Sequence, residues 1–61
     1  MTRKEYMEQL KKYLKRLPKE DYDNAIEYFS EYFDEAGSEN ERQVMEELGQ
    51  PKEAARELVL N

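Results

Sequence analysis

The 61-residue sequence contains no cysteine, no histidine and no tryptophan. Without cysteine it forms no disulfide and no thiolate zinc site, which are the commonest supports of very small domains. Without cysteine or histidine it also lacks the side chains that nucleophilic triads, zinc catalysis and neutral-pH general bases usually need. Its many carboxylates are typical of a solvated helix face. We therefore expect a protein that is not an enzyme and uses no cofactor or metal.

Long apolar runs are also absent. No window approaches the roughly 18 apolar residues of a membrane span, and the N-terminus leads into no signal-peptide segment. The formal net charge of −5 argues against nucleic-acid binding, because that requires a cationic surface. We expect a cytoplasmic location and no nucleic-acid partner. The apolar turn at 58–60 has no capping glycine, so we expect residues 1–61 to be one helical domain of a longer protein.

The sequence does contain residues that mark the starts and ends of helices. Thr2 and Glu5 have the spacing of a capping box, which predicts a helix start. Leu17 should end this helix, because a residue that precedes proline disfavours the α conformation. Pro18 then suits the first position of a second helix, where its missing N–H costs nothing.

Two glycines and a second proline divide the remainder of the chain. Gly37 is expected to be a left-handed C-cap, and Ser38 with Glu41 repeats the capping-box spacing. Gly49 closes the third helix, and Pro51 is expected at the first position of the fourth. The predicted helices comprise residues 3–17, 18–36, 39–48 and 51–60. The predicted fold is all-α, a small compact bundle of two longer and two short helices.

The second predicted helix has the densest apolar pattern. It contains five of the seven aromatic residues, repeated at spacings of three and four, so we expect it to be the centre of the fold. Tyr22, Phe29 and Phe33 are expected in the core. Tyr28 and Tyr32 lie at the edge of the apolar arc, where tyrosine either keeps its hydroxyl hydrated or anchors an interface.

Charge is unevenly distributed along the chain. Residues 1–19 contain seven Lys or Arg against two Glu, whereas residues 20–50 contain one Arg against eleven acidic residues. One interpretation is that the basic first helix lies antiparallel to the acidic second helix and forms screened ion pairs with it. The other is that the first helix keeps an exposed positive stripe, which would meet an anionic membrane or another copy's acidic face. The residues of this stripe are Lys4, Lys11, Lys12, Lys15 and Arg16.

Several segments together have a familiar order. They are Leu10, Leu14, Leu17-Pro18, Tyr28-Phe29, Tyr32-Phe33-Asp34-Glu35-Ala36-Gly37, Glu41, Val44, Glu47-Leu48-Gly49-Gln50-Pro51 and Ala54-Ala55. This order resembles the HAAS-type helical domain that opens a family of bacterial membrane proteins. The resemblance covers nearly the whole chain. It implies a cytoplasmic helical module ahead of transmembrane helices, often encoded beside a PadR-like transcription regulator, with no catalytic or ligand residues to carry over.

Two functions follow as hypotheses. The first is a non-enzymatic interaction or adaptor domain of a membrane-associated signalling protein, with a protein partner such as a PadR-like regulator. The second is a structural domain that self-associates without a signalling partner. Tyr28, Tyr32, Lys11, Lys12 and Lys15 are the candidate interface residues. Membrane contact is expected only through segments beyond residue 61 or weakly through the basic first helix.

Overall fold

The computed structural model describes the backbone of residues 1–60 and the side chains of residues 1–58. This part of the chain is all-α, as predicted, and measures about 32 × 20 × 18 Å. Its elements are α1 (Arg3–Leu14), α2 (Lys19–Ala36), the 3₁₀ turn η1 (Ser38–Asn40), α3 (Glu41–Leu48) and α4 (Pro51–Leu60). The side chains of Val59 and Leu60, in the apolar turn noted above, lie outside the described part.

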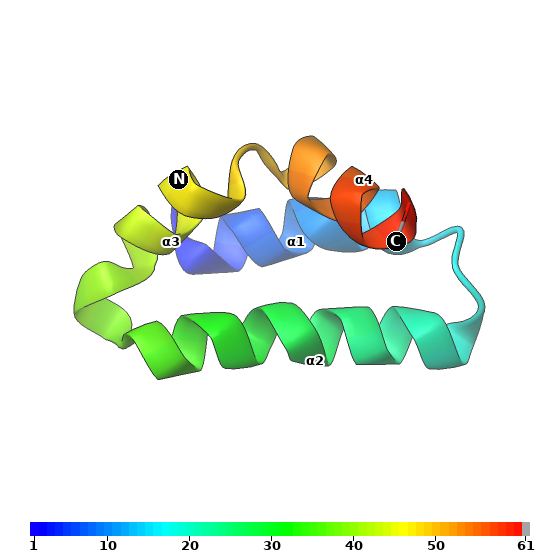
Figure 1. The fold of residues 1–61 in the computed structure, drawn as a ribbon, viewed down its shortest axis with the longest axis horizontal. Coiled ribbons are helices and arrows are strands. Elements are labelled where there is room, and N and C mark those ends of the chain that lie inside the picture. The colour runs from blue at the N-terminus through cyan, green and yellow to red at the C-terminus, as the bar shows by residue number, and fades with distance from the viewer. Residues whose placement is uncertain (61) are drawn as a thin grey trace.

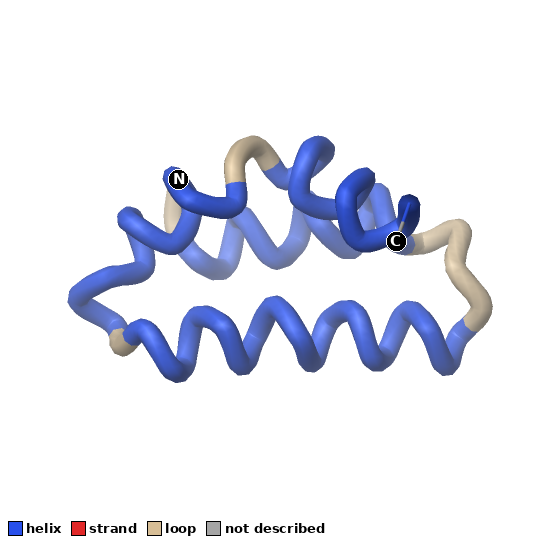
Figure 2. The backbone as a smooth tube through the Cα atoms, in the orientation of Figure 1, coloured by secondary structure: helices blue, strands red, loops and turns tan. Residues whose placement is uncertain are grey.

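The helices form three rows. α2 runs along one side of the molecule and antiparallel to α1, whereas α3 and α4 follow each other along the remaining side (Figure 1). Short connections join the rows at residues 15–18 and at Gly37, and another joins α3 to α4 at residues 49–50 (Figure 2). α1 contacts α2, α3 and α4, so it holds the three rows together.

The start of α1 follows the predicted capping box. The Glu5 N–H donates to the Thr2 hydroxyl oxygen at 3.2 Å, and the Thr2 N–H donates to a Glu5 carboxylate oxygen at 3.0 Å. Hydrogen bonding of the Glu5 carboxylate with Thr2, first from the Thr2 N–H and then from its hydroxyl, lowers the pKa of Glu5 because it favours the charged form. The predicted N-terminus of the first helix is therefore confirmed.

The turn between α1 and α2 differs from the prediction in two ways. α1 ends at Leu14 rather than Leu17, because the chain tightens into a turn in which the Leu17 N–H donates to the Leu14 carbonyl at 3.0 Å. Pro18 has an extended ψ of 151°, so it is the N-cap of α2 and not its first helical residue. Its carbonyl accepts from the Tyr22 N–H at 2.8 Å and so starts the helix.

The connection from α2 to α3 also corrects the prediction. Gly37 has a φ of +89°, which glycine adopts without the cost a side chain would add, but its ψ of 156° is extended rather than left-handed helical. Ser38 lies in η1, and Asn40 precedes α3. Asn40 does not cap α3, because its side-chain amide donates to the Ala36 carbonyl at 2.8 Å. The capping box predicted at Ser38 and Glu41 is therefore wrong.

The core is centred on α1, not on α2 as predicted. Its largest fully buried side chains are Tyr6, Leu10, Leu14, Phe29 and Phe33, of which the first three belong to α1. The Tyr6 and Phe33 rings meet edge to face at a centroid distance of 5.8 Å. α2 buries Phe29 and Phe33 as expected, but Tyr22 is only partly buried at the margin of the core. The outer face of the long α2 helix is thereby left to solvent.

Candidate functional site

The exposed Tyr28 and the partly buried Tyr32 form a pair on α2, which we call the aromatic edge. They are one helical turn apart, and their ring centroids lie 6.3 Å from each other. Tyr28 is 49% exposed, yet its ring packs edge to face against the buried Phe29 at 5.2 Å. The core therefore holds an accessible aromatic ring in a defined position.

The aromatic edge borders two shallow hollows between α2 and the row formed by α3 and α4. One, of about 120 Å³, lies between Tyr28, Leu48 and Leu58. The other, of about 210 Å³, lies between Tyr32, Val44 and Glu47. Apolar side chains of three helices thus converge on the edge, which makes it a continuous strip rather than two isolated rings.

The border of this strip is acidic. The Tyr32 hydroxyl donates to a Glu47 carboxylate oxygen at 3.4 Å. The charge of Glu47, and then partial burial, raise the pKa of Tyr32 because both disfavour the phenolate. Glu57 borders the neighbouring hollow. The edge therefore presents aromatic surface flanked by carboxylates, which suits a partner with apolar and basic groups.

The three candidate lysines lie elsewhere. Lys11, Lys12 and Lys15 border a hollow of about 480 Å³, together with Lys19, Leu17 and Tyr22. We call this the lysine hollow. It shares no residue with the hollows beside the aromatic edge. The structure therefore brings the tyrosines together and the lysines together, but as two separate surfaces.

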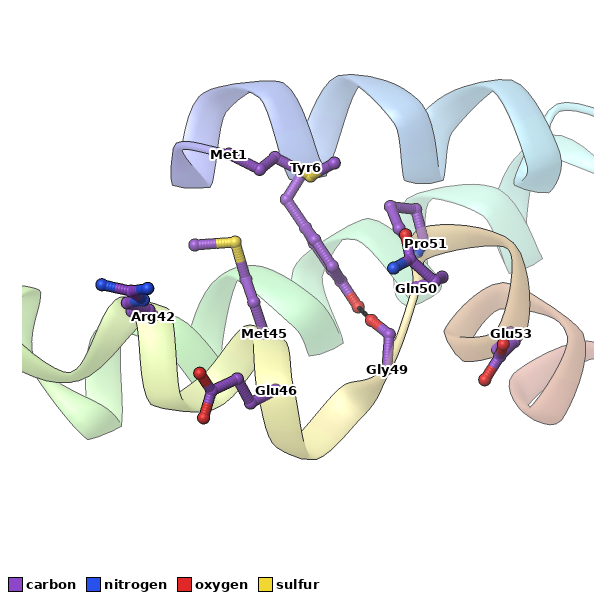
Figure 3. A pocket seen from close by; sticks show the side chains of 9 residues that line it. All are labelled: Met1, Tyr6, Arg42, Met45, Glu46, Gly49, Gln50, Pro51 and Glu53. Carbon is purple, nitrogen blue, oxygen red and sulfur yellow. Dashed lines mark hydrogen bonds between the residues drawn. The ribbon is translucent and has the colours of Figure 1, made fainter.

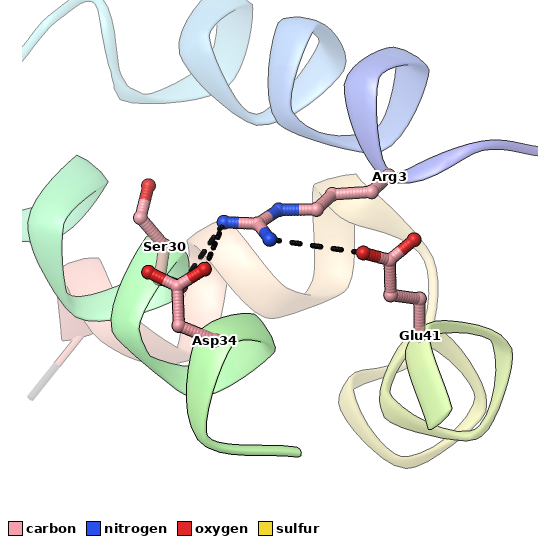
Figure 4. Close-up of polar contacts among 4 residues, drawn as sticks. All are labelled: Arg3, Ser30, Asp34 and Glu41. Atoms are coloured by element: carbon pink, nitrogen blue, oxygen red, sulfur yellow. Dashed lines mark hydrogen bonds and ion pairs between the residues drawn. The ribbon is translucent and has the colours of Figure 1, made fainter. Parts of the chain in front are cut away.

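Ion pairing inside the domain depends on Arg3. The basic first helix lies antiparallel to the acidic second helix and pairs with it, as one interpretation predicts, but among the described side chains Arg3 is the one cation of α1 that does so. The Arg3 guanidinium lies 2.9 Å from an Asp34 carboxylate oxygen and 3.7 Å from a Glu41 oxygen (Figure 4). It also donates to the Ser30 carbonyl at 3.3 Å and lies 5.3 Å from the centre of the Phe33 ring. Among the described side chains these are the ion pairs found, so the lysines keep their charge free of partners there.

A further hollow, of about 670 Å³, lies beside the break between α3 and α4 (Figure 3). Tyr6 is 1% exposed and its hydroxyl donates to the Gly49 carbonyl at 2.7 Å. Burial, and then the charge of Glu53, raise the pKa of Tyr6 to about 12. Sequence reasoning missed this contact, since it joins residues 43 positions apart. The contact fixes the end of α3 onto α1.

Two further observations concern what the described residues contain. No three acidic side chains among them converge as metal ligands would. In this part of the chain, no helix combines the length and the hydropathy needed to cross a membrane.

The arrangement defines a small all-α domain with an exposed aromatic edge and a separate basic hollow. The family model named HAAS matches residues 5–57. The chain belongs to the HAAS family. No curated protein and no solved structure shows a match to it.

Proposed function

We propose that this HAAS domain is a non-enzymatic interaction module that binds a partner protein through the aromatic edge. Its role would be that of an adaptor in a bacterial membrane-associated signalling protein, on the cytoplasmic side. The observation that carries the proposal is the half-exposed Tyr28 ring held against the buried Phe29. Rigid tyrosines at the centre of an apolar strip are typical of interaction hot spots.

The residues of the strip indicate what kind of partner segment would bind there. Leu48 and Leu58 add apolar surface beside Tyr28, and Glu47 and Glu57 add negative charge at the border. A partner segment with one or two apolar anchors and flanking Lys or Arg would complement both features. The PadR-like regulator implied by the family resemblance is the first partner to test.

The test is isothermal titration of the purified domain with a purified PadR-like regulator from the same gene neighbourhood. Tyr28→Ala should weaken binding at least 30-fold, which corresponds to about 2 kcal/mol for a hot-spot residue. The matched control is Tyr13→Ala, because Tyr13 is 46% exposed, nearly as much as Tyr28, but lies on α1. It should leave the affinity unchanged. Equal affinities for the two variants would refute the assignment of the interface.

Self-association through the same edge is the competing assignment. Sedimentation equilibrium of the domain alone separates the two. A monomer that binds the regulator supports the adaptor role. A dimer that Tyr28→Ala dissociates, with no regulator binding, replaces it with the structural role.

A further inference from the structure

The lysine hollow combines charge and apolar surface in a way that the interaction role does not use. Of the six residues that border it, four are lysines and none is acidic. Leu17 and Tyr22 are its apolar components, and each is only partly buried. The hollow is therefore bordered by four ammonium groups, which we call its ring, and by two partly accessible apolar side chains, which we call its floor.

Local geometry places the lysines on the same side. Lys11 and Lys12 lie in the last turn of α1, and Lys15, the C-cap of that helix, follows Lys11 by one turn. Lys19 lies three residues before Tyr22 on α2 and shares its face, whereas Glu20 points about 160° away from Tyr22. The ring closes because α1 stops at Leu14, which lets residues 15–18 turn back and bring Lys19 beside the lysines of α1.

The two ends of the molecule differ in charge. The residues that border the lysine hollow belong to the end of α1, the connection at 15–18 and the start of α2. This connection lies at one end of the molecule, and η1 with the start of α3 lies at the other (Figure 1). Seven acidic residues lie toward that far end, against the cations Arg3, Lys4 and Arg42; they are Glu31, Asp34, Glu35, Glu39, Glu41, Glu46 and Glu47. Toward the first end, Lys11, Lys12, Lys15, Arg16 and Lys19 outnumber Glu20, Asp21 and Asp23. A negatively charged surface would therefore attract the first end and repel the second, which orients the domain.

The residue types favour a membrane surface over a single phosphate or a carboxylate peptide. The ring contains lysines and no arginine, so it offers mobile point charges rather than a planar fork for bidentate recognition. Lysines around exposed leucine and tyrosine are also the combination that lies at a bilayer interface, with the charges at the headgroups and the apolar groups below them.

We infer that the lysine hollow is a docking surface for an anionic lipid bilayer. Lys11, Lys12, Lys15 and Lys19 contact the headgroups, and Leu17 and Tyr22 enter the interfacial layer. The acidic end then points away from the bilayer. The aromatic edge, which shares no residue with the hollow, stays open to a protein partner.

The first arm of the test is co-sedimentation of the whole domain with vesicles of phosphatidylglycerol and phosphatidylcholine in equal parts. Each lysine near an anionic surface contributes about fivefold to binding, so Lys11→Gln with Lys12→Gln and Lys15→Gln should weaken it about 100-fold. Binding should also fall as salt rises from about 0.1 M to about 1 M, because the screening length shortens from about 10 Å to about 3 Å. Pure phosphatidylcholine should not bind.

The matched control carries the same change in net charge away from the hollow. Lys4→Gln, Arg42→Gln and Lys52→Gln remove three exposed cations, none of which borders the lysine hollow or forms an ion pair among the described residues. This variant should lose less than tenfold. Equal losses in the two triple variants would mean that net charge alone drives binding, and would overturn the proposal.

The second arm tests insertion of the floor. The chain has no tryptophan, so Leu17→Trp supplies a unique fluorescent reporter. Its emission should shift to the blue on anionic vesicles and be quenched by brominated acyl chains. Tyr13→Trp should do neither, because position 13 lies about 160° around the helix axis from Lys11 and Lys15 and about 100° from Lys12. Circular dichroism checks that both variants fold.

The remaining outcomes overturn the proposal. No binding of the wild-type domain to anionic vesicles would do so directly. Binding of a hexaglutamate peptide that depends on Lys11, Lys12 and Lys15, without vesicle binding, would reassign the hollow to an acidic protein segment. Vesicle binding without a shift in the Leu17→Trp emission would contradict insertion of the floor.

Discussion

Changing Tyr6 to phenylalanine isolates the effect of one buried hydroxyl on stability. In the wild-type domain this hydroxyl donates to the Gly49 carbonyl at 2.7 Å, and the ring is 1% exposed. Its loss removes one hydrogen bond and leaves the carbonyl without its donor, which costs about 1 kcal/mol. At about pH 8, Tyr6→Phe should therefore lower the free energy of unfolding by that amount.

The same hydroxyl makes the wild-type domain sensitive to alkali. The pKa of Tyr6 is about 12 in the folded domain against an ordinary value of 10.0, so folding favours the neutral phenol. Its stabilising effect is complete below pH 10 and is lost as the pH rises toward 12. The whole loss is about 2–3 kcal/mol, and about 1.4 kcal/mol is gone by pH 11. This is a large share of the roughly 3–9 kcal/mol expected for a chain of this length.

The two effects oppose each other, so the order of stability should reverse. Tyr6→Phe should be the less stable protein at about pH 8 and the more stable one above about pH 10.6. The assay is urea unfolding followed by far-UV circular dichroism at a series of pH values up to about 11. Every other residue is the same in both proteins, so the difference between the two curves isolates Tyr6. Parallel curves without a crossing would refute the reasoning.

Two further changes test the connections of the fold. Arg3→Gln should lower the free energy of unfolding by about 1–2 kcal/mol, since it removes the pairing with Asp34 and Glu41 and the contact with the Phe33 ring. The wild-type domain should also lose stability in high salt while the variant does not; an identical salt response in urea titrations contradicts the role given to Arg3. Gly37→Ala should cost about 1–3 kcal/mol from backbone strain alone, because φ is +89° and no atom lies within 4 Å of the added methyl group. An unchanged thermal midpoint would show that the turn adopts another conformation.

The positions of the helices were predictable because their signals are local. The capping box at Thr2 and the start of α4 at Pro51 depend on residues a few positions apart. The end of α1 and the start of α3 were not predictable in this way. α1 ends early because the Leu17 N–H donates to the Leu14 carbonyl. α3 starts late because the Asn40 side-chain amide donates to the Ala36 carbonyl. Such competing hydrogen bonds leave no periodic trace in the sequence.

The candidate surfaces were likewise predictable where they depend on neighbouring residues and not where they depend on the conformation of a turn. Tyr28 and Tyr32 share a helix, so their spacing and their place at the margin of the apolar arc were enough to pair them. The lysine hollow was only half predicted. The predicted stripe contained Lys11, Lys12 and Lys15, but it also contained Lys4 and Arg16, which do not border the hollow. Lys19 and the apolar floor join the three lysines through the turn at 15–18. The conformation of that turn could not be predicted from the sequence.

The measurement that tests the central proposal most directly is a chemical-shift titration of the isotope-labelled domain with the PadR-like regulator. Perturbed resonances should cluster at Tyr28, Tyr32, Leu48 and Leu58, and the same titration of Tyr28→Ala should leave the spectrum largely unmoved. A perturbed set confined to the lysine hollow, or no perturbation at all, would contradict the assignment of the aromatic edge as the interface.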